Sequence, residues 1–141
     1  MKTKIIVLTT AFLMTVSVMF AQDAKPVPSF IEKELQAEFK DVTNLQWKTV
    51  DQFYKASFTT EETALDVFYS FDGTLTAVSR KLTVDQLPLV LVKEVKEKAI
   101  NYGISELFEL LTDKGTEYFL VVNNEKETKT YRSEGHYWTR Y

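Results

Sequence analysis

The hydrophobic residues that follow position 28 first recur at helical spacing. Ile31, Leu35 and Phe39 stand at i, i+4 and i+8, and the positions between them are mostly charged or polar. This period predicts a helix that covers a core with one of its faces. Ser29 and Glu32 have the S-x-x-E spacing of a capping box, so we expect this helix to begin there, directly after Pro28.

The hydrophobic period then changes from helical spacing to two. Apolar residues alternate with more polar ones over three stretches, which predicts antiparallel strands joined by short turns. The turns are expected at Asp51-Gln52, Glu61-Glu62 and Asp72-Gly73, and a fourth strand is expected at "TLTAVSRKL". The alternating residues, which we expect to face the helix, are Leu45 and Trp47; Tyr54, Ala56 and Phe58; Leu65, Val67, Tyr69 and Phe71.

The same order of elements returns in the second half of the chain. Pro88 opens "PLVLVKEVKEKAINYG", where Leu91, Val95, Ala99 and Tyr102 share one helical face and Gly103 supplies a stop. Four strands are expected after it, in "ISELFELL", "EYFLVVN", "ETKTYRS" and "HYWTRY". The pattern therefore predicts an α+β protein made of two tandem helix-plus-four-antiparallel-strand units, residues 28–82 and 83–141, with the helices on one face of the sheet.

The first 21 residues have the layout of a secretory signal peptide. Lys2 and Lys4 precede a 16-residue apolar stretch, Ile5 to Phe20, and Ala21 is the expected cleavage residue. The apolar stretch is shorter than the about 20 residues that a membrane anchor needs. We therefore expect an exported, soluble protein of the periplasm or extracellular space, with residues 22–27 as an exposed leader. The absence of cysteine excludes disulfides and a lipid-modified N-terminal cysteine.

Charge and motif content exclude several classes of function. The formal charge is −3, and removal of the signal peptide would take it to −5, so nucleic acid and anionic membranes are not the expected partners. The sequence has no G-x-S-x-G, H-E-x-x-H, P-loop or G-x-G-x-x-G motif. His136, the only histidine, is a poor metal site without a second nitrogen or sulfur ligand. We therefore expect no enzyme activity, no cofactor and no metal.

Several short motifs together resemble one family. They are a helix opening at Pro28, Trp47 in the first strand, Y-x-A-x-F at 54–58, F-D-G at 71–73, and Leu87-Pro88 opening the second helix, with Val92 following. In this respect the chain, over roughly residues 27–141, resembles the beta-lactamase-inhibitor-like, PepSY-like family of exported bacterial proteins. The second unit departs from the pattern, with Ser133-Glu134-Gly135 in place of Phe-Asp-Gly. The resemblance implies tandem units with helices on one sheet face, and a role in binding or inhibiting other envelope proteins.

The strand alternation also defines a second face of the sheet, which mixes aromatic and charged residues. If Tyr54 and its partners face the helices, their neighbours point the other way, and we expect the rings on that side to face solvent. Aromatic anchors among polar contacts are typical of protein-binding surfaces. The candidate binding residues are Phe53, Lys55, Asp66, Phe68, Phe119 and Val121.

The sequence thus predicts a non-enzymatic, protein-binding or inhibitor-like module of the bacterial cell envelope, which binds a protein or peptide through this open sheet face. The alternative is a small-ligand-binding protein with a pocket between the helices and the sheet. A ligand binder needs a cavity of about 300 Å³ or more, whereas a protein binder needs an accessible patch.

Overall fold

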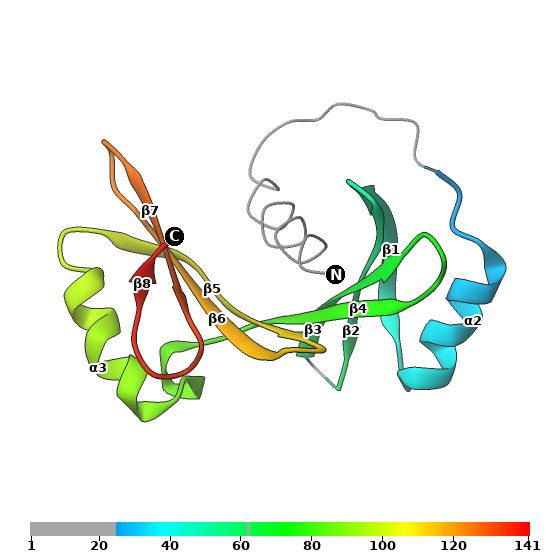
Figure 1. Cartoon of the computed structure of the whole chain (residues 1–141), viewed down its shortest axis with the longest axis horizontal. Helices are drawn as coiled ribbons and strands as arrows, with labels where there is room; N and C mark the ends of the chain where they lie inside the picture. The colour runs from blue at the N-terminus through cyan, green and yellow to red at the C-terminus, as the bar shows by residue number, and fades with distance from the viewer. Residues whose placement is uncertain (1–24, 62) are drawn as a thin grey trace.

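One antiparallel sheet of eight strands, in the order β1 to β8, dominates the computed structural model, which describes residues 25–61 and 63–141 (Figure 1). The two α-helices of these residues lie at opposite ends of the sheet (Figure 1). The helices are α2 (Ser29–Glu38) and α3 (Leu89–Lys98), with a 3₁₀ turn, η2 (Val84–Gln86), before α3. The strands are β1 (Thr43–Val50), β2 (Phe53–Thr60), β3 (Thr63–Ser70), β4 (Leu75–Lys81), β5 (Gly103–Thr112), β6 (Gly115–Asn123), β7 (Thr128–Ser133) and β8 (Thr139–Arg140). The α+β class is confirmed.

Helix α2 buries the face that its periodicity predicted. Ile31 and Leu35 are fully buried, and Phe39 packs beside them with its ring 5.1 Å from that of Phe58. The helix begins differently from expectation, because Pro28 is the N-cap and no side chain caps the first turn. The predicted Ser29–Glu32 capping box is therefore wrong, since Ser29 is already the first helical residue.

The core beneath α2 consists of residues that alternate along β2 and β3. With the two helix residues, the buried members are Tyr54, Ala56, Phe58, Val67 and Tyr69. Their spacing of two is the one that the sequence pattern gave. The β2–β3 register pairs Tyr54 with Tyr69 and Ala56 with Val67, so directly opposed side chains share this face.

The predicted turns are found where residues can adopt a left-handed backbone. Asp51, between β1 and β2, has φ 51°, and Gly73, between β3 and β4, has φ 91°. The side chain of Asp72 accepts hydrogen bonds from Ser70 and from the backbone N–H of Thr74, which closes the β3–β4 turn. Asp and Gly tolerate this backbone region better than other residues, so a local signal was sufficient to predict these turns.

Strand β1 differs from its predicted alternation. Trp47 packs on the α2 side, with its ring 6.1 Å from that of Tyr69, but it is only partly buried. Leu45, expected on the same side, is 36% exposed. The cause is a register shift between Thr43 and Gln46, where Asn44 has φ 55°. Such a bulge interrupts the alternation of side chains locally.

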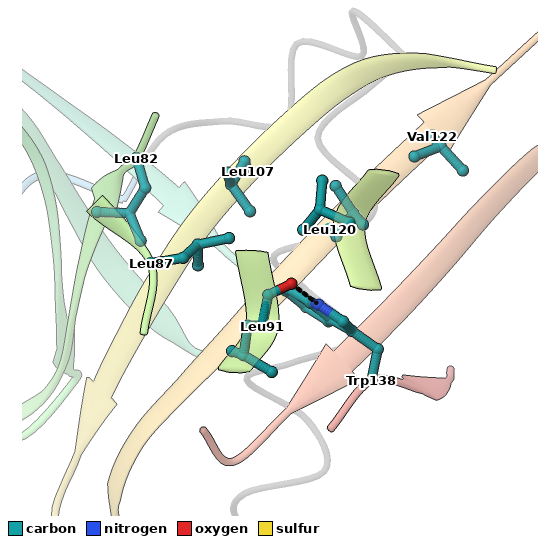
Figure 2. Packing of buried hydrophobic residues seen from close by; sticks show 8 residues of the cluster. Leu82, Leu87, Leu91, Leu107, Leu120, Val122 and Trp138 are labelled. Atoms are coloured by element: carbon teal, nitrogen blue, oxygen red, sulfur yellow. Dashed lines mark hydrogen bonds between the residues drawn. The ribbon is translucent and has the colours of Figure 1, made fainter. Parts of the chain in front are cut away.

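Helix α3 packs on a second core, shown in Figure 2. Leu91 and Val95 are buried as predicted, and Ala99 and Tyr102 pack against them. The remaining buried members are Leu82, Leu87, Leu107, Leu120, Val122 and Trp138. The predicted helix stop is two residues too late, because Asn101, with φ 64°, supplies the left-handed residue before β5 begins at Gly103.

The C-terminal segment of the chain contacts helix α3 and also pairs with strand β7. Trp138 is 5% exposed, and its indole N–H donates a hydrogen bond to the carbonyl of Leu91 at 3.2 Å (Figure 2). Its backbone N–H donates to a carboxylate oxygen of Glu94 at 3.4 Å. The predicted strand "HYWTRY" is consequently reduced to Thr139–Arg140, because the residues before it are used to reach the helix.

The N-terminal predictions are only partly within the described residues. The expected signal peptide, residues 1–21, lies outside them and stays a prediction. Of the expected leader, Lys25 and Pro26 are exposed, and the Lys25 ammonium group lies 4.5 Å from the centroid of the Phe71 ring. Val27 is partly buried against the core beneath α2, so the leader is not wholly exposed. Within the described part of the chain, no helix is long and apolar enough to cross a membrane.

Candidate functional site

The six predicted binding residues lie on the side of their strands that points away from the cores beneath the helices. On β2, Phe53 and Lys55 alternate with Tyr54 and Ala56, and on β6 Phe119 and Val121 alternate with Leu120 and Val122. Cross-strand pairing places Lys55 directly opposite Phe68, and Ser57 opposite Asp66. Because paired residues share a face of the sheet, these side chains line one surface.

The rings on this surface are buried, and the expectation that they face solvent is wrong. Phe53 is 8% exposed, and Phe68 and Phe119 are each 1% exposed. They form a third cluster, here called the aromatic floor, whose members are Phe53, Phe68, Ala77, Phe108, Leu110 and Phe119. The rings of Phe108 and Phe119 stack with centroids 5.0 Å apart. Side chains from five neighbouring strands, β2 to β6, cover one another here, which an alternation pattern taken strand by strand cannot show.

The structure brings five of the six candidates together and leaves one apart. Phe53, Phe68 and Phe119 share the aromatic floor, and the Lys55 ammonium group lies 5.8 Å from the centroid of the Phe68 ring. Val121 is 9% exposed but lies outside this cluster. It is paired with Glu106 on β5 and Thr130 on β7, toward the other end of its strand.

Beside the aromatic floor, a polar triad is held in one arrangement. The Lys55 Nζ atom lies 2.8 Å from Asp66 Oδ2, and the Ser57 hydroxyl donates to Asp66 Oδ1 at 2.6 Å. The two charged side chains are 14% and 28% exposed. Each oxygen of the carboxylate has a partner, so Asp66 acts as an acceptor that positions Lys55 and Ser57. This arrangement presents a fixed pattern of charge and hydrogen-bonding groups to a ligand.

A groove of about 520 Å³ opens over this triad. The volume falls within the range typical of ligand pockets, about 300 to 1,000 Å³. The groove is lined from strands β1 to β5 by the triad, by further polar or charged residues of β1 and β4, and by a carboxylate and an aromatic residue of β5. Its lining includes Gln46, Lys48, Lys55, Ser57, Asp66, Ser79, Lys81, Glu106 and Phe108.

Of the predicted binding residues, only Lys55 and Asp66 line the groove, so the sequence analysis missed most of its lining. The missed residues include Lys48 on β1 and Ser79 and Lys81 on β4, which all line the groove. The signal was present, because Lys48 follows Trp47 and Lys81 precedes Leu82, and both of those apolar residues belong to the cores beneath the helices. Because adjacent residues of a strand point to opposite faces, Trp47 and Leu82 place Lys48 and Lys81 on the face away from the helices.

Neither of the described cavities lies between a helix core and the sheet. The aliphatic and aromatic clusters of α2 and α3 fill that space. The second cavity, of about 490 Å³, lies at the C-terminal end of α2, between Phe39 and Leu45. Within residues 25–61 and 63–141, no group of three His, Cys, Asp or Glu side chains lies close enough together to hold a metal ion. His136 lies exposed after Gly135, between β7 and β8.

Comparison with known proteins gives matches in structure. No family model matches the sequence, and no curated protein matches it significantly. A BLIP-like protein from Bacteroides fragilis NCTC 9343 superposes with a TM-score of 0.68 at 16% identity, covering 84% of this chain and 88% of that one. A protein from Bacteroides eggerthii DSM 20697 that is inferred to be periplasmic gives 0.72 at 10% identity, covering 82% and 90%. A DUF2874 family protein from Bacteroides uniformis ATCC 8492 gives 0.65 at 12% identity, covering 74% and 78%.

These likenesses extend over most of each chain, and at such low identity they concern the fold alone. They agree with the inhibitor-like half of the family resemblance found in the sequence, while its PepSY-like half stays a prediction. This chain therefore has the fold of the BLIP-like and DUF2874 proteins of Bacteroides.

Proposed function

We propose that this chain is an exported, non-enzymatic binding module, inhibitor-like in character, that holds a protein or peptide of the cell envelope in the groove above the aromatic floor. The observation that carries the proposal is the groove itself. It places the ordered Lys55–Asp66–Ser57 triad next to Phe108, the member of the aromatic floor that lines it, and its lining comes from five adjacent strands. Pre-ordered polar groups favour specific binding, because fewer side chains have to be immobilised on association.

Two further features support the proposal. The basic and apolar character of residues 1–21 is typical of export, and one protein of the same fold is inferred to be periplasmic. Another protein of the same fold, from Bacteroides fragilis, is named as BLIP-like. We also infer that residues 28–82 and 83–141 are tandem units with their helices on one sheet face. In support, a helix followed by four strands occurs twice, and each helix has a hydrophobic core of its own.

Affinity capture with groove variants tests the proposal. The exported protein is immobilised and exposed to envelope extract from its host, and bound proteins are identified by mass spectrometry. Lys55→Glu should abolish capture, because it removes the cation that holds Asp66 and places two carboxylates together. Lys93→Glu makes the same charge change on the exposed side of α3 and should leave capture intact. Capture that Lys55→Glu leaves unchanged would place the binding surface elsewhere.

A small ligand in the groove is the second candidate, favoured by the volume of about 520 Å³. Native mass spectrometry of the exported protein distinguishes the two. A bound small molecule that Lys55→Glu displaces would support the ligand, and a protein captured by the unmodified groove would support the binding module.

A further inference from the structure

The groove carries a charge opposite to that of the whole chain. Its lining includes the three lysines Lys48, Lys55 and Lys81, against the two carboxylates Asp66 and Glu106. The chain as a whole has a formal charge of −3. A local excess of positive charge inside a concave surface attracts anionic groups, because the walls of the groove reduce screening by solvent.

Two of these lysines have no partner for their charge in the described part of the chain. Lys55 is paired with Asp66 at 2.8 Å. Lys48 and Lys81 form no ion pair with any residue of 25–61 or 63–141, and both are exposed. Their ammonium groups are therefore accessible to a bound anion.

The position of Lys48 is unfavourable for the isolated fold. The β1–β2 register places it directly opposite Lys55, and both line the groove. Like charges in direct cross-strand pairs are destabilising. Asp66 offsets the charge of Lys55, and a carboxylate from a partner would offset that of Lys48.

Lys48 and Lys81 stand at opposite corners of the groove. Lys48 shares a cross-strand row with Lys55, Phe68 and Ala77, which spans three strand spacings, or about 14 Å at about 4.8 Å each. Lys81 lies four residues further along β4 than Ala77, which adds about 13 Å in the perpendicular direction. The two Cα atoms are thus roughly 20 Å apart, the length of about six residues of extended chain.

Ser79 adds an uncommitted hydroxyl between these two corners. It is 3% exposed and lines the groove, and it lies directly opposite Asp66 in the β3–β4 register. The hydroxyl makes no hydrogen bond with other described residues, whereas the neighbouring Ser57 hydroxyl is used by Asp66. A serine hydroxyl in this position can donate to a carboxylate or to a peptide carbonyl.

We propose that the groove receives an extended acidic segment of a partner protein, about six residues long, whose carboxylates bind Lys48 and Lys81 at its two ends. The inference rests on the proposed binding function and names the chemistry of the partner. Lys48 is the stronger anchor. Glu106 lies two positions along β5 from Phe108, the residue paired with Lys81, so it offsets part of the charge of Lys81 from about 7–8 Å.

Fluorescence anisotropy of a labelled hexaglutamate peptide with the exported protein tests this inference. We expect binding that weakens between 50 and 300 mM NaCl, since it depends on accessible charges. Lys48→Gln should weaken it about fivefold, Lys81→Gln less, and the double variant about tenfold or more. The control is the Lys93→Gln/Lys114→Gln double variant, which makes the same charge change outside the groove and should bind normally.

Changing the length or the charge of the peptide probe can contradict the inference. Triglutamate should bind about tenfold more weakly than hexaglutamate, because it cannot reach both lysines. Equal binding of hexalysine, equal binding by the Lys48→Gln/Lys81→Gln variant, or displacement of hexaglutamate by inorganic phosphate at low millimolar concentration would each overturn the inference. The last result would indicate a compact anion site.

Failure here is distinguishable from failure of the proposed function. If Lys55→Glu abolishes capture of an envelope protein but hexaglutamate does not bind, the groove is a binding surface and the acidic segment is wrong. If neither experiment depends on the groove, both proposals fail.

Discussion

Tyr69 has a buried hydroxyl group whose removal should stabilise the protein. The residue is fully buried in the core beneath α2, and its hydroxyl oxygen has no hydrogen-bond partner among the residues that the structure describes. A buried polar group without a partner loses its hydration on folding and gains nothing in return, at a cost of about 1–3 kcal/mol. Tyr69→Phe keeps the ring and removes this cost. We therefore expect the free energy of unfolding to rise by about 1–2 kcal/mol, which is roughly 4–10 °C in Tm for a domain of this size.

Urea unfolding at pH 7 measures the effect, and Tyr102→Phe is the matched control. The Tyr102 hydroxyl donates to a carboxylate oxygen of Glu127 at 2.5 Å and accepts from Lys129, both at the surface. Its removal should lower the free energy of unfolding slightly, by about 0–1 kcal/mol, so the two substitutions have opposite signs. A loss of 1 kcal/mol or more in Tyr69→Phe would refute the reasoning, because it would mean that the hydroxyl is hydrogen-bonded in the folded protein.

Alkaline pH should enlarge the difference between Tyr69→Phe and the unmodified protein. Burial, together with the nearby carboxylates of Glu38 and Glu34, raises the pKa of Tyr69 above its usual value of 10.0. The unfolded chain therefore releases this proton at a lower pH than the folded protein. Deprotonation favours the unfolded state, so the unmodified protein loses stability as the pH rises above 10. Tyr69→Phe lacks this loss, and urea titrations at pH 9, 10 and 11 should show its advantage growing.

Three further predictions concern other parts of the chain. Trp138→Ala should cost about 3–5 kcal/mol in urea unfolding and Trp47→Ala less, because Trp138 is buried with a hydrogen bond to Leu91, whereas Trp47 is partly exposed; the reverse order would contradict the packing described. Gly73→Ala should lower Tm more than Gly115→Ala, since both have positive φ but, of the two, only at Gly73 would a Cβ atom meet a side chain, the ring of Phe30. Mass spectrometry of the protein exported by its host should find Gln22 at the N-terminus, and an intact Met1 to Ala21 on that product would exclude signal cleavage.

The local period of the sequence predicted which way most side chains point. Ile31, Leu35, Leu91 and Val95 are buried where helical spacing placed them, and successive side chains of β2 and β3 point to opposite faces as expected. Side-chain direction depends on backbone geometry within one element, so a single sequence carries that information. The bulge at Asn44 broke the alternation at Leu45, because a bulge depends on how two strands pair and not on one of them.

The burial of side chains was less predictable from the sequence than the direction in which they point. The contacts of the C-terminal segment were also not predictable. Phe108 on β5 covers Phe119 on β6, although nothing in either strand alone requires it. Trp138 reaches Leu91 across 47 positions of sequence. Such contacts depend on the arrangement of all eight strands. Of the groove's lining, the sequence analysis named Lys55 and Asp66, which form an ion pair between adjacent strands. It did not name Lys48 and Lys81, which lie on β1 and β4 and line the same groove only in the assembled sheet.

The burial of the aromatic floor also changes how the binding face should be tested. Exposed rings could be removed without loss of stability, but Phe119 is 1% exposed, stacks on Phe108 and contacts the ring of Tyr141 edge-on at 6.0 Å. Phe119→Ala should therefore cost about 3–5 kcal/mol, and Phe53→Ala a comparable amount.

Urea unfolding measures these losses, with Leu111→Ala, a 51% exposed residue, as a control that should cost under about 1 kcal/mol. Unchanged melting of Phe119→Ala would mean that the ring faces solvent after all, and would restore the open face that strand alternation alone predicts. If the loss is found, truncation of the rings cannot separate folding from binding. That separation then has to come from the charged lining, where Lys48 and Lys81 are exposed and can be changed without opening a cavity in the core.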